Sequence, residues 1–220
     1  MRAVTSSNGS VFVGDHDEPT GLGELITVTS SGICGSDLHG IASGLSGVIL
    51  GHEFGGFTSD GTLVAVRPTG ECGSCPQCTS GFPHTCPQAM ATLHGFFING
   101  GLAEYVRVEP SRLVPVPAGT DAATVGLVEP LAVVVHGINR VTLIKGMSAL
   151  VVGSGSIGLL TAAVLADRGI NVDIVCRHPH QFEAAEKLGV NAVSKPGTNY
   201  DVSFDAVCTQ ESLDICFNAT

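Results

Sequence analysis

The chain has 220 residues, enough to bury a sizeable core in one domain or in two small ones. With 44% hydrophobic and only 14% charged residues, its composition is that of a globular protein and excludes a disordered one. The formal net charge is -10 and the ten Lys and Arg residues are spread thinly, so we expect no nucleic acid and no membrane as a partner.

Neither a targeting segment nor a membrane span is readable. Residues 1–18 contain no apolar run long enough for a signal peptide. The longest apolar stretch, residues 126–138, is too short to span a bilayer and contains Glu129, Pro130 and His136. Outside one cluster the cysteines are scattered and look unpaired: they are Cys34, Cys176, Cys208 and Cys216. These features predict a cytoplasmic protein.

Residues 1–118 are predicted to form one domain, mainly of antiparallel β-structure. Glycine-rich turns separate short runs in which β-branched and polar residues alternate, most clearly in residues 24–30, 62–68 and 103–117. Such period-2 alternation is typical of strands with one buried face.

Side chains that bind metals or transfer protons occur through this domain and just after it: Cys34, Ser36, Asp37, His39, His52, Glu53 and Glu129. Each has an ordinary structural explanation, such as a small buried cysteine, a hydrogen-bonded histidine or an acid at a helix N-terminus. Together they form a mixed set of thiol, imidazole and carboxylate groups, which is what an open catalytic zinc site uses.

The sequence from Glu71 to Cys86, ECGSCPQCTSGFPHTC, contains four of the eight cysteines. They are Cys72, Cys75, Cys78 and Cys86, separated by two, two and seven residues. Two explanations compete, a set of disulfides and a metal site. A disulfide between cysteines three apart would close a strained ring, whereas four converging thiolates suit the tetrahedral cage of a structural Zn²⁺.

After residue 118 the pattern changes, and we predict a second domain over residues 119–220. The predicted strands are residues 148–152, 171–176, 191–195 and 203–208, and the predicted helices are residues 179–189 and a stretch that ends near Gly169. Strands and helices in alternation indicate a parallel sheet with right-handed crossovers. The fold class is therefore α/β, with four readable strands in the second domain.

The first strand of this domain runs into a turn with the pattern G-x-G-x-x-G, which is Gly153, Ser154, Gly155, Ser156, Ile157 and Gly158. Alone the pattern is weak, but here it follows an apolar strand and opens a helix, as the dinucleotide-binding fingerprint requires. The first glycine makes the turn, the second lets the backbone approach a pyrophosphate, and the third packs the helix against the strand. The alternative is an ordinary strand-to-helix turn.

The end of the second strand bears on the identity of the nucleotide. An acid there would bind a ribose 2′-hydroxyl and repel a 2′-phosphate, but the chain has Cys176 and Arg177 at this place. Asp173 stands too early, inside the strand. Arg177, flanked by His178 and His180, could hold a 2′-phosphate, so NADP(H) is favoured over NAD(H). A solvated surface arginine is the alternative.

Taken in order, the segments ICGSDLH, GHEF, the four-cysteine loop, GGLAEYV, VEPLAV and VVGSGSIG resemble the zinc-dependent medium-chain alcohol dehydrogenases. The EPLAV segment is more similar to the branch of sorbitol and threonine dehydrogenases. The resemblance implies a GroES-like β domain that carries a catalytic and a structural zinc, followed by a Rossmann domain that binds NADP or NAD. It also implies hydride transfer between an alcohol or polyol and the nicotinamide.

By position, the resemblance implies that Cys34 and His52 bind the catalytic zinc, with Glu53 or Glu129 completing the set. It implies that Asp37 orients His52, a role that zinc-bound histidines commonly need.

The resemblance also gives roles to two residues near Cys34. Ser36 would take the hydroxyl proton of the substrate, and His39 would pass it outward. The zinc would act as a Lewis acid that lowers the pKa of the alcohol.

The chain departs from the family in two ways. The segments between Cys34 and His52 and between Phe54 and Cys72 are shorter than usual, which predicts a trimmed β domain. The chain ends at residues 211–220, in the helix expected after the fourth strand, where the family continues with two more strands that commonly build a dimer interface. We therefore expect a truncated cofactor domain with low turnover alone, and a homo-oligomer is left open.

The leading hypothesis is a zinc-dependent dehydrogenase that acts on a small alcohol or polyol. An alternative from another class is a non-catalytic zinc-binding fragment or a regulatory relative that keeps the fold without turnover. A thiol redox protein is disfavoured, because the C-x-x-C pairs form one four-thiol cluster.

Overall fold

The computed structural model describes residues 1–220 and divides into two compact units, Met1–Glu129 and Pro130–Thr220. The boundary predicted after residue 118 stays a prediction, since the compact units divide later, within helix α3 (Val128–Ile138). Each unit has a hydrophobic core of its own.

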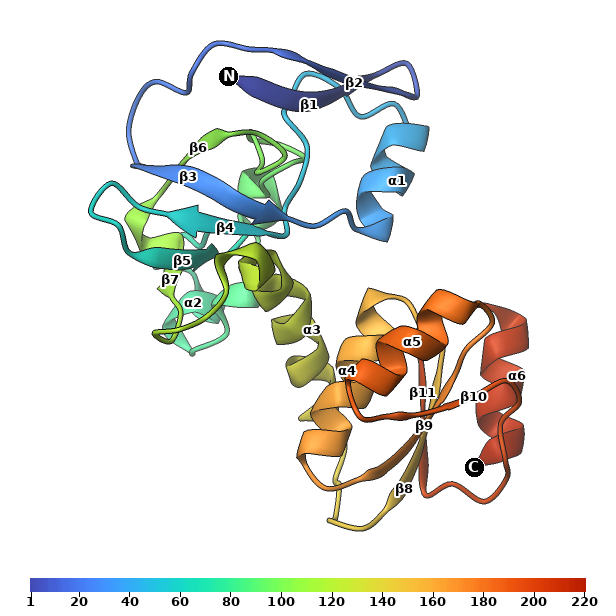
Figure 1. Ribbon diagram of the computed structural model, residues 1–220. Helices are drawn as coiled ribbons and strands as arrows, with labels where there is room; N and C mark the ends of the chain where they lie inside the picture. The colour runs from blue at the N-terminus through green and yellow to red at the C-terminus, as the bar shows by residue number, and fades with distance from the viewer. The chain divides into compact units, whose positions relative to one another are not determined.

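The first unit opens with a two-stranded hairpin of β1 (Arg2–Ser7) and β2 (Ser10–Asp15), which was not predicted (Figure 1). Asn8 and Gly9 form its turn with φ angles of 50° and 76°. Positive φ at both central residues is what a type I′ turn requires, and Asn-Gly is its preferred sequence. The dipeptide was therefore a readable signal for this hairpin.

A five-stranded antiparallel sheet in the order β6-β3-β4-β5-β7 forms the body of the first unit, which confirms the period-2 interpretation. The strands are β3 (Glu24–Ser31), β4 (Phe54–Phe57), β5 (Leu63–Val66), β6 (Tyr105–Val108) and β7 (Leu113–Pro115). Inward-facing side chains from four of these strands make the core, which consists of Ile26, Phe54, Val64, Val66, Val106 and Val108.

The connections between these strands carry short helices and most of the predicted site residues. Helix α1 (Gly35–Ala42) follows β3. The remaining short helices of this unit are α2 (Pro76–Thr79) and the 3₁₀ turns η1 (Pro83–Thr85), η2 (Met90–Thr92), η3 (Pro110–Arg112) and η4 (Ala122–Leu127). Most of the candidate chemistry therefore lies on loops held by a rigid sheet.

The second unit contains a four-stranded parallel sheet in the order β10-β9-β8-β11, as the alternating pattern predicted. The strands are β8 (Ser148–Val152), β9 (Asn171–Val175), β10 (Asn191–Val193) and β11 (Val202–Asp205). The helices between and after them are α4 (Ser156–Asp167), α5 (Pro179–Lys187) and α6 (Gln210–Ala219).

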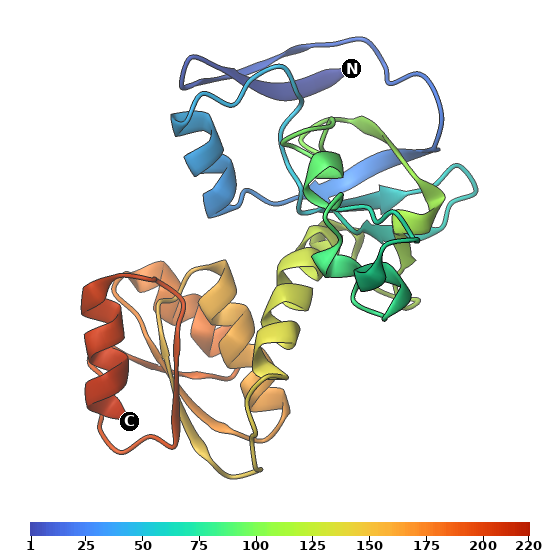
Figure 2. The same ribbon diagram turned by 180° about the vertical axis from the view of Figure 1, so that it is seen from behind.

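Helices cover both faces of this parallel sheet (Figure 2). In β8, Ala149 and Val151 join the core made with α4 and α5, whereas Leu150 and Val152 join the core made with α6. Successive side chains of a strand point to opposite faces, so a strand covered on both sides needs a continuous apolar run. This is why the sequence of β8 shows no alternation.

Candidate metal centres and nucleotide site

Four cysteines lie together in the segment that connects β5 to β6, here called the four-cysteine lobe (residues 70–92). The sulfur atom of Cys75 lies 3.5 Å from that of Cys78 and 3.8 Å from that of Cys86. The sulfur atoms of Cys72 and Cys78 are 4.0 Å apart. A tetrahedral cage with Zn–S bonds of ~2.3 Å has sulfur–sulfur edges of about 3.8 Å. All four cysteines are free thiols, so the arrangement fits a metal ion rather than disulfides.

The backbone of the lobe favours ionised sulfur at one position. The N–H groups of Ser74 and Cys75 stabilise the thiolate of Cys72 and lower its pKa to about 6. Desolvation and the neighbouring Cys75 sulfur raise the pKa of Cys78 to about 12. Four crowded thiols resist ionising together, so a cation is needed before all of them become thiolates.

Arg112 fastens the two ends of the lobe to each other. Its guanidinium, in a residue only 3% exposed, donates hydrogen bonds to the carbonyl oxygens of Arg67, Pro68 and Thr92. These carbonyls stand just before the lobe and at its end. Arg112 was not predicted, because no local sequence pattern distinguishes a buried arginine from one on the surface.

Cys34, His52 and Glu53 converge although they come from separate segments. Cys34 is the N-cap of α1, whereas His52 and Glu53 immediately precede β4, which pairs with β3. One ligand atom from each of the three lies within 4.8 Å of the other two. A thiolate, an imidazole and a carboxylate make a three-ligand set of the catalytic kind, which leaves a fourth position for water or substrate.

Asp37 lies behind this set and is only 1% exposed. Its Oδ2 accepts a hydrogen bond from the backbone N–H of Cys34 at 2.8 Å, and its Oδ1 accepts one from Nδ1 of His52 at 3.2 Å. Burial disfavours a charged imidazole, but Asp37 and Cys34 outweigh it and raise the pKa of His52 to about 9. Since Nδ1 donates its proton to Asp37, a metal ion would bind at Nε2 and displace the second proton of the ring.

Two carboxylates were predicted as alternatives for the third ligand, and they lie at different places. Glu53 is 8% exposed and belongs to the converging set. A Cβ at Gly32 would collide with its carboxylate, so a glycine there makes room for it. Glu129, in the first turn of α3, lies outside this set. It is close enough to feel the charges of the set: burial and the charge of Glu53 raise the pKa of Glu129, while the charge of His52 lowers it.

The remaining predicted residues of this region are on α1. Ser36 is exposed, and its Oγ lies 3.4 Å from Nε2 of His52. His39 is exposed one turn further along the helix. The structure adds Phe96, whose ring meets the imidazole of His52 edge-on with centroids 5.6 Å apart. No sequence signal pointed to this phenylalanine.

The glycine turn of the second unit has the geometry that its pattern predicts. Gly153 has φ 101°, a left-handed conformation, and a Cβ at Gly158 would overlap the carbonyl oxygen of Gly153. A Cβ at Gly155, the N-cap of α4, would meet no atom within 4 Å, so the space in front of this helix N-terminus is open. Ser156 and Ile157 begin the helix and present backbone N–H groups that lack intrahelical partners.

Arg177 follows β9 and is exposed, with its backbone N–H bound to Oε1 of Gln181 at 2.8 Å. The rings of His178 and His180 stack beside it, 5.6 Å apart. Asp173 is unavailable to a ribose, because its two oxygens accept hydrogen bonds from Asn191 and from Tyr200. The structure therefore offers a cation, and no free acid, at the end of this strand.

Comparison with known proteins decides the family. Residues 23–118 match the model of the alcohol dehydrogenase GroES-like domain, and residues 149–220 match that of ketopantoate reductase PanE/ApbA. The chain is 36% identical over 212 residues to a sorbitol dehydrogenase of Halalkalibacterium halodurans, an alignment that covers 87% of this chain and 61% of that relative. The chain belongs to the zinc-type medium-chain alcohol dehydrogenase family.

Two further likenesses confirm the predicted family and fold of the chain. L-idonate 5-dehydrogenase (NAD(P)(+)) of Escherichia coli K12 is 28% identical over 229 residues, covering 90% of this chain and 66% of that protein. A candidate zinc-binding dehydrogenase of Sinorhizobium meliloti 1021, solved with NADP, has a TM-score of 0.86 at 28% identity and covers 100% of this chain and 73% of that one. The chain spans less than two thirds of the length of the curated relatives.

Proposed function

We propose that this medium-chain dehydrogenase transfers a hydride between a small alcohol or polyol and a nicotinamide cofactor, with a zinc ion at Cys34, His52 and Glu53. The observation that carries the proposal is the convergence of these three side chains, with Asp37 buried behind His52. Sorbitol and L-idonate, which the names of two relatives give as substrates, support the alcohol or polyol class.

When bound, zinc supplies a Lewis acid that lowers the pKa of an alcohol oxygen. The chain's own residues orient the site and move the proton. Asp37 holds Nδ1 of His52, which would leave Nε2 as the nitrogen that binds the metal. Ser36, with its Oγ 3.4 Å from that nitrogen, is placed to accept the hydroxyl proton of a substrate, and the exposed His39 hands it on to solvent.

We propose that the four-cysteine lobe holds a second, structural zinc. The donor set is closed, because Cys72, Cys75, Cys78 and Cys86 leave no position for a substrate. Its chemistry is therefore stabilisation of the lobe and not turnover.

We propose NADP(H) as the cofactor. The open space at Gly155 and the free N–H groups of Ser156 and Ile157 suit a pyrophosphate at the N-terminus of α4. Arg177 suits a 2′-phosphate, because a guanidinium forms charge-assisted hydrogen bonds with phosphate oxygens.

We also propose a cytoplasmic location. No helix of the structure is both long enough and apolar enough to cross a membrane. All eight cysteines are free, and a thiol-rich metal lobe is typical of a reducing compartment.

The decisive experiment measures metal content, nucleotide binding and turnover on one preparation. We expect two zinc ions per chain, tighter binding of NADPH than of NADH, and NADPH formation with sorbitol, L-idonate or another secondary alcohol. Arg177→Asp should weaken NADPH binding roughly tenfold, the value of one charge-assisted hydrogen bond, and leave the zinc content unchanged.

Two results would contradict the proposal. Two zinc ions with neither nucleotide binding nor any detectable turnover would favour the non-catalytic alternative. Equal affinities of the native chain for NADPH and NADH would remove the role of Arg177.

A further inference from the structure

A short loop presents Phe96 to the imidazole of His52. This loop, here called the Phe96 loop (residues 93–99), closes on itself: the N–H of Phe97 donates to the carbonyl of Leu93 at 3.0 Å, and the N–H of Gly95 donates to that of Ile98 at 2.8 Å. The ring planes of Phe96 and His52 meet at 61°. Such an edge contact is an attractive geometry for aromatic rings, and it depends on where the loop lies.

His94 closes the base of the Phe96 loop from inside the protein. Its ring is 2% exposed, packs edge-on against Phe54 with centroids 5.4 Å apart, and donates from Nδ1 to the carbonyl oxygen of Asn99 at 2.6 Å. Nε2 is buried and has no hydrogen-bond partner. Burial and the charge of Arg112 lower the pKa of His94 to about 4, which keeps the ring neutral with its proton on Nδ1.

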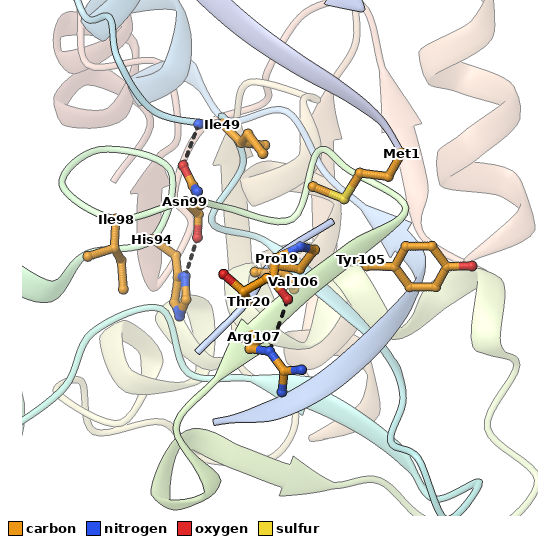
Figure 3. Close-up of a pocket in the computed structure, with 10 residues that line it drawn as sticks. All are labelled: Met1, Pro19, Thr20, Ile49, His94, Ile98, Asn99, Tyr105, Val106 and Arg107. Atoms are coloured by element: carbon orange, nitrogen blue, oxygen red, sulfur yellow. Dashed lines mark hydrogen bonds between the residues drawn. The ribbon is translucent and has the colours of Figure 1, made fainter. Parts of the chain in front are cut away.

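The same loop is fixed to the segment that leads into His52. The side-chain oxygen of Asn99 accepts a hydrogen bond from the N–H of Ile49 at 3.0 Å, so Asn99 joins Ile49 to His94 (Figure 3). Gly95 lies directly against the backbone of Gly51, where a Cβ would come within 2.8 Å of the Gly51 nitrogen. The loop and the residues before His52 therefore form one packed unit.

His94 is behind the second metal centre and not part of it. The pocket drawn in Figure 3 has a volume of about 140 Å³ and is lined by His94 and Asn99, but by none of the candidate ligands. No group of metal-binding side chains includes His94. One nitrogen of this buried histidine is bound to a loop carbonyl and the other has no partner. Such a residue needs an explanation other than catalysis.

We propose that His94 is a positioning residue: by closing the Phe96 loop it holds the ring of Phe96 against His52 and so fixes the orientation of the metal-binding imidazole. Asp37 fixes the ring through Nδ1, and Phe96 restricts its rotation from a second side. The inference rests on the proposed function only in taking His52 as a metal ligand. It predicts that the hydrogen bond of one particular nitrogen controls the second centre.

Two substitutions of similar polarity distinguish the role of Nδ1 of His94 from that of Nε2. The amide nitrogen of asparagine stands one bond from Cγ, as Nδ1 does, whereas glutamine carries its amide nitrogen at about the reach of Nε2. His94→Asn should therefore keep the bond to Asn99 and His94→Gln should lose it. Thermal unfolding of both chains serves as the control for folding, and Phe96→Ala removes the group through which His94 is proposed to act.

The first readout needs no metal: a nuclear Overhauser contact between the ring protons of Phe96 and His52. It should persist in the native chain and in His94→Asn and disappear in His94→Gln. The second readout is the dissociation constant for the second zinc, from competition with a chelator. We expect it to rise roughly tenfold in His94→Gln, as for other partners of metal ligands, and to stay within about twofold in His94→Asn.

A double-substitution cycle decides whether His94 acts through Phe96. In the Phe96→Ala background, His94→Gln should cause no further loss of zinc affinity. Equal losses in both backgrounds, or an unchanged ring contact in His94→Gln, would overturn the proposal. If the native chain binds only one zinc, the proposed function fails, and the ring contact alone then confirms or overturns the role of His94.

Discussion

The two candidate metal centres of the first unit differ in how the chain builds them. The four-cysteine lobe takes four like donors from one stretch, residues 72–86, and the N–H groups that support them, those of Cys75 and Gln88, lie in this stretch or directly after it. The second centre takes three unlike donors from positions 34, 52 and 53, which only the pairing of β3 with β4 brings together. A locally built centre supports itself, whereas one built by tertiary structure depends on its neighbours.

The difference also separates stability from reactivity. The lobe has no open position and its ends are tied to the sheet by Arg112. The second centre has three donors, an exposed Ser36 beside it, and buried neighbours that fix its imidazole. We therefore expect the two centres to respond to substitution as differently as they are built.

Cys86→Ala should have the largest effect. Cys86 is buried in the lobe, and without its sulfur the lobe should lose its zinc and much of its structure. We expect the free energy of unfolding of the zinc-loaded chain to fall by more than about 4 kcal/mol, because loss of a structural metal is among the most destabilising changes. Cys34→Ala is the matched control, which should remove the other zinc and cost about 1 kcal/mol or less. The measurements are the zinc content and the denaturant unfolding of both variants. Equal losses of stability would show that the two centres do not differ in how much they stabilise the chain.

Acid should weaken the surroundings of the second centre through His94. Burial holds the pKa of His94 at about 4, below the value of about 6.5 expected in the unfolded chain. The unfolded chain therefore binds the proton first as the pH falls. The contribution of His94 to the free energy of unfolding is fully present above about pH 6.5. It is lost progressively as the pH falls towards 4, by at most about 3 kcal/mol. The measurement is urea unfolding over this pH range for the native chain and for His94→Asn, whose curve should be flatter. Parallel curves would contradict the assignment.

How far the sequence predicted these two centres follows from how they are built. The cysteine spacing and the glycine turn are local patterns, and each carries its geometry within a few residues. Most strands of both sheets were readable for the same reason, since burial of one face or of two faces leaves its own periodicity. Strand β4, with the sequence FGGF, has no such periodicity and was not predicted. The Asn8-Gly9 hairpin carried a local signal too, but it was overlooked.

The parts that were not predicted depend on contacts between distant residues. Phe96, His94 and Arg112 lie in ordinary stretches of sequence, and nothing near them shows that one meets His52, another is buried neutral and the third ties the lobe. The four ligands of the lobe could be named without a structure. The neighbours of the second centre could not, apart from Asp37 and Ser36, which the family resemblance supplied.

Asp37→Asn should weaken the second centre and leave the lobe intact. The single amide oxygen can accept from His52 or from the backbone N–H of Cys34 but not from both, and the negative charge that supports the imidazole is lost. We expect a loss of 10- to 100-fold in affinity for the second zinc, the usual effect at partners of metal-bound histidines. Asp60→Asn, at an exposed turn between β4 and β5, is the matched control and should change neither zinc. A loss of the lobe zinc in Asp37→Asn would contradict the independence of the two centres.

The smallest effects on zinc affinity are expected for substitutions of Glu53 and Glu129, and they should show which of the two is the third ligand. Glu53 lies within 4.8 Å of the other donors, so Glu53→Gln should weaken the second zinc roughly tenfold. Glu129 lies outside that set, so glutamine at this position removes no donor from it. We therefore expect Glu129→Gln to change the affinity by less than about threefold. Chelator competition on the two variants measures both values. The reverse order would make Glu129 the third ligand, and the second centre would then draw on the start of α3 as well as on the sheet, which would make it more dispersed and the contrast with the lobe sharper.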